Sequence, residues 1–172
     1  MKMTYLVLAE NEILTAEGRR LSFDQMVDNV NRHETILRFS HGKFACSEIQ
    51  DIQPDLECEE LPVTKITLST GEQFLLLDTS EVLTTDNQWV KVKDIATGYG
   101  MKTLTYNPCV KHPQLTPKII TTLESYIAPF LPVVSFQTLS DNLLLSVAKN
   151  DNISVLIPLR PTKEFASVSL VC

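Results

Sequence analysis

The stretch Thr64–Tyr106, TKITLSTGEQFLLLDTSEVLTTDNQWVKVKDIATGYGMKTLTY, indicates the fold class of this chain. Lys65–Ser69 alternates β-branched and other residues, and a Thr-Gly turn separates it from a second apolar run, Phe74–Leu77. Val82–Thr84 is a third run, and a polar turn then leads into Trp89–Lys93. Short apolar runs bounded by Gly, Asp and Asn are typical of strands joined by turns. A series of short strands is therefore predicted here.

The opening of the chain predicts a hairpin followed by a short helix. Two strand-like segments, Ile13–Thr15 and Arg19–Phe23, flank a turn in which Gly18 is free to adopt a positive φ. A Ser-x-x-Gln capping box begins at Ser22, which predicts one or two helical turns within Phe23–Val30.

The rest of the chain also favours strands, with one ambiguous segment. Thr35–Ser40 and Lys43–Ile52 predict a second hairpin around His41-Gly42, followed by an acidic, solvated connector over residues 54–60. Residues 107–117 contain three prolines and are expected to be a loop. Lys118–Ile127 fits a helix with one apolar face, but its β-branched run favours a strand. Further strands are predicted at Val133–Gln137, Leu143–Lys149, Ile153–Pro158 and Phe165–Val171, with a hairpin turn at Asn150–Asn152.

Composition agrees with a single all-β domain over residues 1–172. The chain is 44% hydrophobic, which is enough for one buried core. Its formal charge of −6, with basic residues scattered, argues against nucleic-acid and anionic-membrane partners. No apolar run approaches the roughly 20 residues that span a bilayer, and no signal peptide is expected. Four cysteines at irregular spacing favour reduced thiols in a cytoplasmic protein.

The order of these features resembles the Hint (hedgehog/intein) domain. That family shows a strand, "T-x-G", a strand, "T-x-x-H", "V-L-T", "x-W" and "x-D-L-x-x-G-D", and Thr64–Gly98 follows the same order. The stretch Val7–Val27 is also similar to the start of an intein. The resemblance is good over Leu6–Tyr106 and looser over Ile119–Val171. It implies a horseshoe of mostly antiparallel strands with one or two short helices, and a strand at Lys118–Ile127. An unrelated β-barrel or sandwich is the alternative fold.

The resemblance also implies where catalytic residues would stand. In the family, an N-terminal thiol or hydroxyl attacks the preceding carbonyl, a histidine protonates the leaving amine, and a terminal His-Asn pair cyclises. Here the nucleophile's position falls at Leu6 or Val7, the "T-x-x-H" turn ends in Glu81, and Leu170 and Val171 replace His-Asn. A carboxylate is a poor proton donor to an amine at neutral pH. The resemblance thus implies a degenerate domain that is not an enzyme.

We therefore expect a catalytically inactive Hint-like domain retained as a structural or protein-binding module, without cofactor or metal. Its partner would be another protein or a second copy, with no nucleic acid and no membrane. The family's distribution suggests a phage virion or assembly component, so the expected location is cytoplasmic or virion. One alternative is autoprocessing peptide-bond cleavage by a non-standard nucleophile, Thr4 or Cys46.

A second alternative is a small metal-binding regulatory protein that uses Cys109, His112, His41 and Cys46. The simpler interpretation is that Cys46 and Cys109 fill apolar gaps and that His112 lies in an exposed loop. Trp89, the only tryptophan, is expected in the core. Asp78 and Glu81 are expected to be solvated carboxylates beside a turn.

Overall fold

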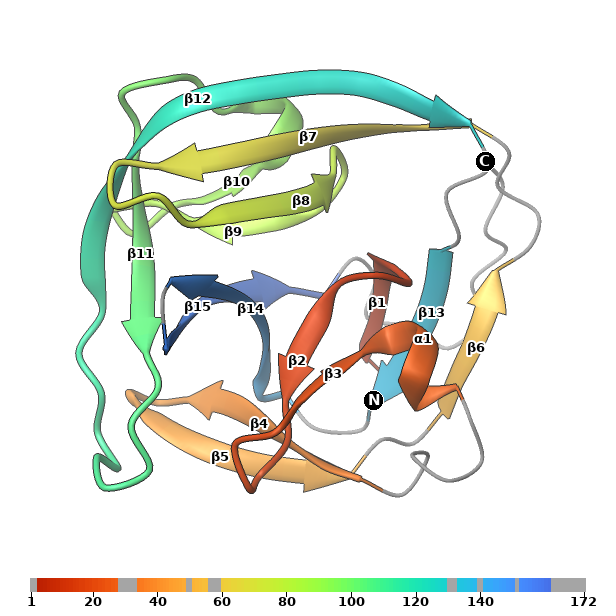
Figure 1. The fold of residues 1–172 in the computed structure, drawn as a ribbon, viewed down its shortest axis with the longest axis vertical. Coiled ribbons are helices and arrows are strands. Elements are labelled where there is room, and N and C mark those ends of the chain that lie inside the picture. Colours follow the sequence, from red (N-terminus) through yellow and green to blue (C-terminus); the bar gives the residue numbers. More distant parts are fainter. Residues whose placement is uncertain are drawn as a thin grey trace.

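The computed structural model describes residues 3–27, 34–48, 51–55, 60–129, 133–138, 141–150 and 152–161. Nearly all regular structure in these residues is β-strand, and the strands pair antiparallel in three sheets (Figure 1). This arrangement confirms the predicted class, a mostly antiparallel all-β fold with a short helix. No helix in the described ranges is long and apolar enough to cross a membrane.

The largest sheet in the described part of the chain has the strand order β5-β4-β14-β15-β11-β12-β7-β8. Two short strands leave this path, because β9 (Glu81–Leu83) pairs with β15 and β10 (Trp89–Lys91) pairs with β9. The strands on the path are β4 (Thr35–Ser40), β5 (Lys43–Glu48), β7 (Glu60–Leu68), β8 (Gln73–Leu77), β11 (Gly100–Thr105), β12 (Thr116–Pro129), β14 (Leu143–Asn150) and β15 (Ile153–Arg160).

β12 settles the ambiguous segment as a strand. Its first residues, 116–119, pair with β11, and the remainder pairs with β7. The register shifts between Ile120 and Thr122, so Thr121 is an extra residue in the ladder. Such a bulge bends a strand, and β12 curves from beside β11 to lie along β7 (Figure 1). A buried ion pair anchors this region, with Lys118 Nζ 2.6 Å from Oε1 of the fully buried Glu72.

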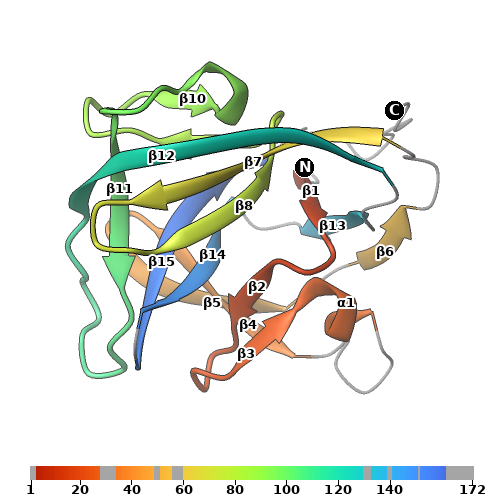
Figure 2. The ribbon, with the colours of Figure 1, turned by 45° about the horizontal axis from the view of Figure 1, so that its top comes forward.

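Two smaller sheets complete the described structure. One has the order β1-β13-β6, and the other is the hairpin of β2 and β3. The sheet of β1, β13 and β6 lies on the opposite side of the molecule from β10 and β11 (Figures 1 and 2). The strands are β1 (Met3–Leu8), β2 (Glu12–Leu14), β3 (Arg20–Ser22), β6 (Asp51–Asp55) and β13 (Val133–Thr138).

The predicted opening hairpin and capping box are confirmed. Gly18 has a φ of +86° in the turn between β2 and β3. The hydroxyl of Ser22 accepts from the Gln25 backbone N–H at 3.1 Å, and the Gln25 side chain accepts from the Ser22 N–H at 2.9 Å. The helix α1 (Phe23–Met26) is one turn long, as predicted, and Val30 lies outside the described residues.

Two boundaries differ from the sequence prediction. The predicted strand Lys43–Ile52 is two strands, because β5 ends at Glu48 and β6 belongs to a different sheet, where it pairs with β13. The predicted connector 54–60 therefore begins inside β6 and ends in β7. The strand at Trp89 ends at Lys91 and continues as a short 3-10 helix, η1 (Val92–Asp94). The predicted strand Phe165–Val171 and the residue Asp151 lie outside the described residues.

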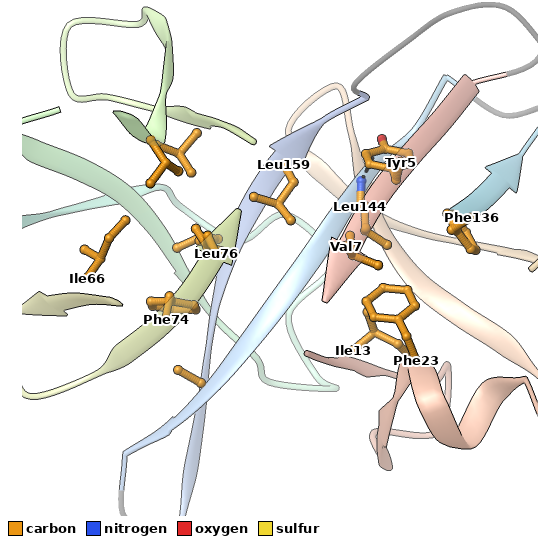
Figure 3. Close-up of a cluster of buried hydrophobic side chains, with 14 of the residues drawn as sticks. Tyr5, Val7, Ile13, Phe23, Ile66, Phe74, Leu76, Phe136, Leu144 and Leu159 are labelled. Carbon is orange, nitrogen blue, oxygen red and sulfur yellow. Dashed lines mark hydrogen bonds between the residues drawn. The ribbon is translucent and has the colours of Figure 1, made fainter. Parts of the chain in front are cut away.

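The main core joins the sheets. Tyr5 and Phe136, from β1 and β13, pack in one buried cluster with side chains from β8, β14 and β15 (Figure 3). Phe136 also meets Phe23 of α1, with ring centroids 6.0 Å apart. Burial of apolar side chains from every sheet supplies the main stabilisation of such a fold.

Candidate functional site

Val7 lies near the end of β1, opposite Val134 of β13. Its side chain is only 3% exposed and belongs to the main buried cluster, near Phe23 and Phe136 (Figure 3). Leu6, the other residue considered for the nucleophile's position, is partly buried. Neither side chain carries an oxygen, nitrogen or sulfur atom, so this position presents only hydrocarbon.

The turn Asp78–Ser80 follows β8 and is well ordered by hydrogen bonds. Its Ser80 is buried, and the Ser80 N–H donates to the Leu77 carbonyl at 3.0 Å. Oδ1 of Asp78 accepts from the Thr64 hydroxyl at 2.7 Å. Asp78 is thus held by a partner and is not simply solvated, contrary to the sequence expectation.

Glu81 begins β9 and stands opposite Arg160 of β15 in the ladder. Its Oε1 lies 4.0 Å from Nη1 of Arg160, and its side chain is 26% exposed. The prediction of a solvated carboxylate was therefore incomplete, because the carboxylate has an ion-pair partner in the sheet.

The fold brings the end of β1 and the end of β8 together, but through apolar side chains. Leu8 and Leu77 belong to one buried cluster with Val63 and Val133. No hydrogen bond or ion pair between Val7 and Glu81 is present among the residues that the structure describes. Leu170 and Val171 lie outside those residues.

Arg38 is a buried charged residue that sequence reasoning missed. It lies on β4, is 0% exposed, and its Cζ is 5.6 Å from the centroid of the Tyr5 ring and 5.8 Å from that of Phe136. The guanidinium donates to the Leu143 carbonyl at 3.1 Å and to the Ser47 hydroxyl at 3.2 Å, and also to the Asn142 carbonyl. The only signal in the sequence is an arginine within the apolar run ILRF.

Arg38 and Tyr5 influence each other electrostatically. Burial lowers the pKa of Arg38, and the nearby Tyr5 hydroxyl acts in the opposite direction. Burial raises the pKa of Tyr5, while Arg38 and the backbone N–H of Leu144, which donates to the hydroxyl at 3.1 Å, oppose that rise. Both groups serve the packing of β1, β4 and β14, since neither is exposed to a ligand.

One prediction for the cysteines is wrong. Cys46 and Cys109 were expected to fill apolar gaps, but both are exposed free thiols. Partial burial of its sulfur nevertheless raises the pKa of Cys46. In the described ranges, no three His, Cys, Asp or Glu side chains gather where they could hold a metal ion. His112 is exposed, as expected.

Two of the open cavities in the described part of the chain have charged and aromatic linings. One, of about 480 Å³, is lined by Trp89, Tyr99, Asp86 and Asp94 among others. Trp89 is therefore partly exposed, and the prediction that it belongs to the core is wrong. The other, of about 440 Å³, lies beside β5 and is lined by Phe44, Tyr106 and basic side chains.

The strand order, the long bent β12 and the contact between β1 and β8 are the main features to compare with known folds. The similar solved structures are inteins and intein-like domains, although no protein-family model matches the sequence and no curated protein matches it. A transcription factor IIB Mvu mini-intein is 14% identical, with a TM-score of 0.64 over 89% of this chain and 99% of that chain.

Two further structures agree. An intein-like domain from Clostridium thermocellum is 14% identical, with a TM-score of 0.60 over 89% of this chain and 98% of that domain. A DnaB intein from Synechocystis is 13% identical, with a TM-score of 0.58 over 89% of this chain and 97% of the intein. At such low identity the likeness concerns the fold, and it confirms the Hint-like architecture predicted from the sequence.

Proposed function

We propose that this chain is an intein-like domain that does not process peptide bonds and acts as a structural or protein-binding module. The observation that carries the proposal is Val7, buried in hydrocarbon where the sequence resemblance places the nucleophile. Nucleophilic catalysis requires a heteroatom and a group that activates it. The side chain of Val7 has no such atom.

The position expected to supply a proton gives the same indication. The carboxylate of Glu81 faces the guanidinium of Arg160 across the β9–β15 ladder. An ionised carboxylate accepts hydrogen bonds and has no proton to donate. This arrangement supports a structural role for Glu81 in holding β9 to β15.

The two alternative nucleophiles are also poorly prepared for attack. Thr4 is 1% exposed and its hydroxyl has no hydrogen-bond partner among the residues that the structure describes, whereas an active threonine needs an adjacent base. The pKa of Cys46 is raised, whereas reactive cysteines have a lowered pKa. Both observations favour a non-processing domain over autoprocessing.

The edge of the large sheet supports binding to a protein. β5 ends the strand order, and the loop after β11 covers its start, because the Phe44 N–H donates to the Lys111 carbonyl at 3.2 Å. Backbone N–H groups alternate in direction along a strand, so the N–H of Cys46, two residues further on, points to the same outer edge. An uncovered strand edge accepts an extended segment of another chain through backbone hydrogen bonds.

The absence of processing is tested by fusing reporter domains to both ends and recording intact masses with and without added thiol. The fusion should keep its full mass. Reproducible scission at either junction, lost in Thr4→Ala, Cys46→Ala or Cys172→Ala, would replace this proposal with the autoprocessing alternative.

The binding role is tested at the β5 edge with Cys46→Pro. Proline removes the outward N–H, and edge positions tolerate it. Cys46→Val keeps that donor and serves as the matched control. Association with a partner or with a second copy, followed by sedimentation, should be lost only in the proline variant. Equal association by both variants would contradict a role for this edge.

A further inference from the structure

The cavity beside β5 has the form of a small-molecule site. It has a volume of about 440 Å³ and lies between the start of β5, the end of β11 and the loop 107–112. Leu37, which is 5% exposed, lines it together with Phe44 and Tyr106. The two aromatic rings have centroids 6.1 Å apart and planes inclined at 59°. Ligand pockets of roughly 300–1,000 Å³ commonly combine an apolar lining with a few polar groups.

Hydrogen bonds and packing between the lining segments and their neighbours hold the walls of this cavity in place. The hydrogen bond from the Phe44 N–H to the Lys111 carbonyl fixes the loop against β5. Within the loop, the Cys109 N–H donates to the Asn107 side chain at 3.0 Å. Gly18 lies close to the Tyr106 ring, since a Cβ atom there would lie 3.1 Å from the ring. The cavity is therefore a built feature of three separate segments.

The charges around this cavity have one sign. The charged side chains that line it are Lys43 and Lys111, the imidazole of His112 lies beside them, and no acidic side chain lines it, although the chain has a formal net charge of −6. None of the three forms an ion pair within the described part of the chain. The cavity at Trp89 has the opposite character, because its charged lining residues are Asp86 and Asp94.

We propose that the cavity beside β5 binds an organic anion with a flat apolar body, such as an aromatic carboxylate. Its ring would lie against Phe44 and Tyr106, where aromatic contacts add to apolar burial. Its carboxylate would accept charge-assisted hydrogen bonds from Lys43 and Lys111. The ligand is either a free small molecule or the aromatic, carboxylate-bearing end of a peptide. This site is independent of the proposed loss of processing, which survives if the cavity binds nothing.

The test is titration calorimetry with 2-naphthoate on the full chain. The double variant Lys43→Gln/Lys111→Gln should weaken binding by about tenfold or more, since it removes both charged donors. The control Lys91→Gln/Lys93→Gln makes the same change in net charge at exposed positions outside the cavity. Equal weakening in both variants, or no binding by the wild type at millimolar ligand, would overturn the proposal.

Two further measurements locate the ligand and its source. In NMR spectra, naphthoate should shift the signals of Phe44 and Tyr106 and leave the indole N–H of Trp89 unchanged, because Trp89 lines the acidic cavity. Neutral 2-naphthamide should bind about tenfold more weakly. A short peptide ending in Phe, with a free or an amidated C-terminus, is compared with naphthoate. Tighter binding of the free-acid peptide than of naphthoate indicates a peptide ligand, and weaker binding indicates a small molecule. Shifts confined to Trp89 would contradict the assignment.

Discussion

Two parts of the molecule use aromatic side chains in opposite ways. Around Val7, the rings of Tyr5 and Phe136 are 2% and 0% exposed and enclose the guanidinium of Arg38. Beside β5, the rings of Phe44 and Tyr106 are partly exposed and share their cavity with basic side chains. The interior rings meet other protein atoms, whereas the outer rings are partly exposed to solvent.

The difference indicates where stability and binding are determined. In the interior, the meeting point of β1 and β8 is filled by buried apolar side chains such as Leu8 and Leu77. At the periphery, charged and aromatic groups face solvent. Changes in the interior should therefore alter the free energy of unfolding, and changes at the outer cavity should alter binding alone.

The largest effect is expected for Arg38→Ala. The substitution leaves a cavity between Tyr5 and Phe136 and removes a donor from the partly buried carbonyls of Leu143 and Asn142. Cavity formation together with unsatisfied polar groups should lower the free energy of unfolding by about 3–5 kcal/mol. Urea denaturation measures it, and Arg38→Met, which keeps most of the volume, is the control. A loss below about 0.5 kcal/mol would mean that the interior does not depend on this residue.

A smaller effect is expected for Val7→Cys. The thiol is slightly smaller than the valine side chain, so the core should lose about 0.5–1.5 kcal/mol, as in Ile→Val changes. The variant restores a thiol at the position of interest, but Glu81 still pairs with Arg160. Fusions of this variant should stay intact by mass spectrometry. Scission by Val7→Cys alone would show that the site still holds the rest of a processing machinery.

Local sequence signals predicted much of this fold because they act over a few residues. The strands between Thr64 and Tyr106 depend on alternation and turn residues, and the capping box at Ser22 depends on two reciprocal side-chain hydrogen bonds. The division of Lys43–Ile52 into β5 and β6 could not be predicted, because β6 pairs with β13, far along the chain.

The candidate site was less predictable for the same reason. Arginine is almost never fully buried unless it is paired, and the burial of Arg38 depends on Tyr5 and Phe136, which come from another sheet. The exposure of Cys46 likewise follows from the position of β5 at a sheet edge. The sequence showed that Val7 has no nucleophile, but only the fold shows that it is packed in the core.

The third prediction, with a smaller expected loss of stability, concerns the short helix α1. Ser22→Ala removes the cap from the Gln25 N–H and should cost about 0.5–1 kcal/mol. Ser22→Asn, which keeps an acceptor at this position, should remain close to the wild type. Thermal unfolding followed by circular dichroism compares the two. Equal losses in both variants would show that the hydroxyl acts through some contact other than capping.

The smallest effect on stability is expected for Lys43→Gln/Lys111→Gln. Both side chains are exposed and form no ion pair in the described residues, so the free energy of unfolding should change by less than about 0.5 kcal/mol. Urea denaturation of this variant and of Arg38→Ala under the same conditions compares the two regions by their change in the free energy of unfolding. If the lysine variant is instead stabilised, repulsion between unpaired cations is relieved, which is typical of a site arranged for an anion. A loss comparable to that of Arg38→Ala would show that the outer cavity is part of the stabilising core, and the contrast between the two regions would fail.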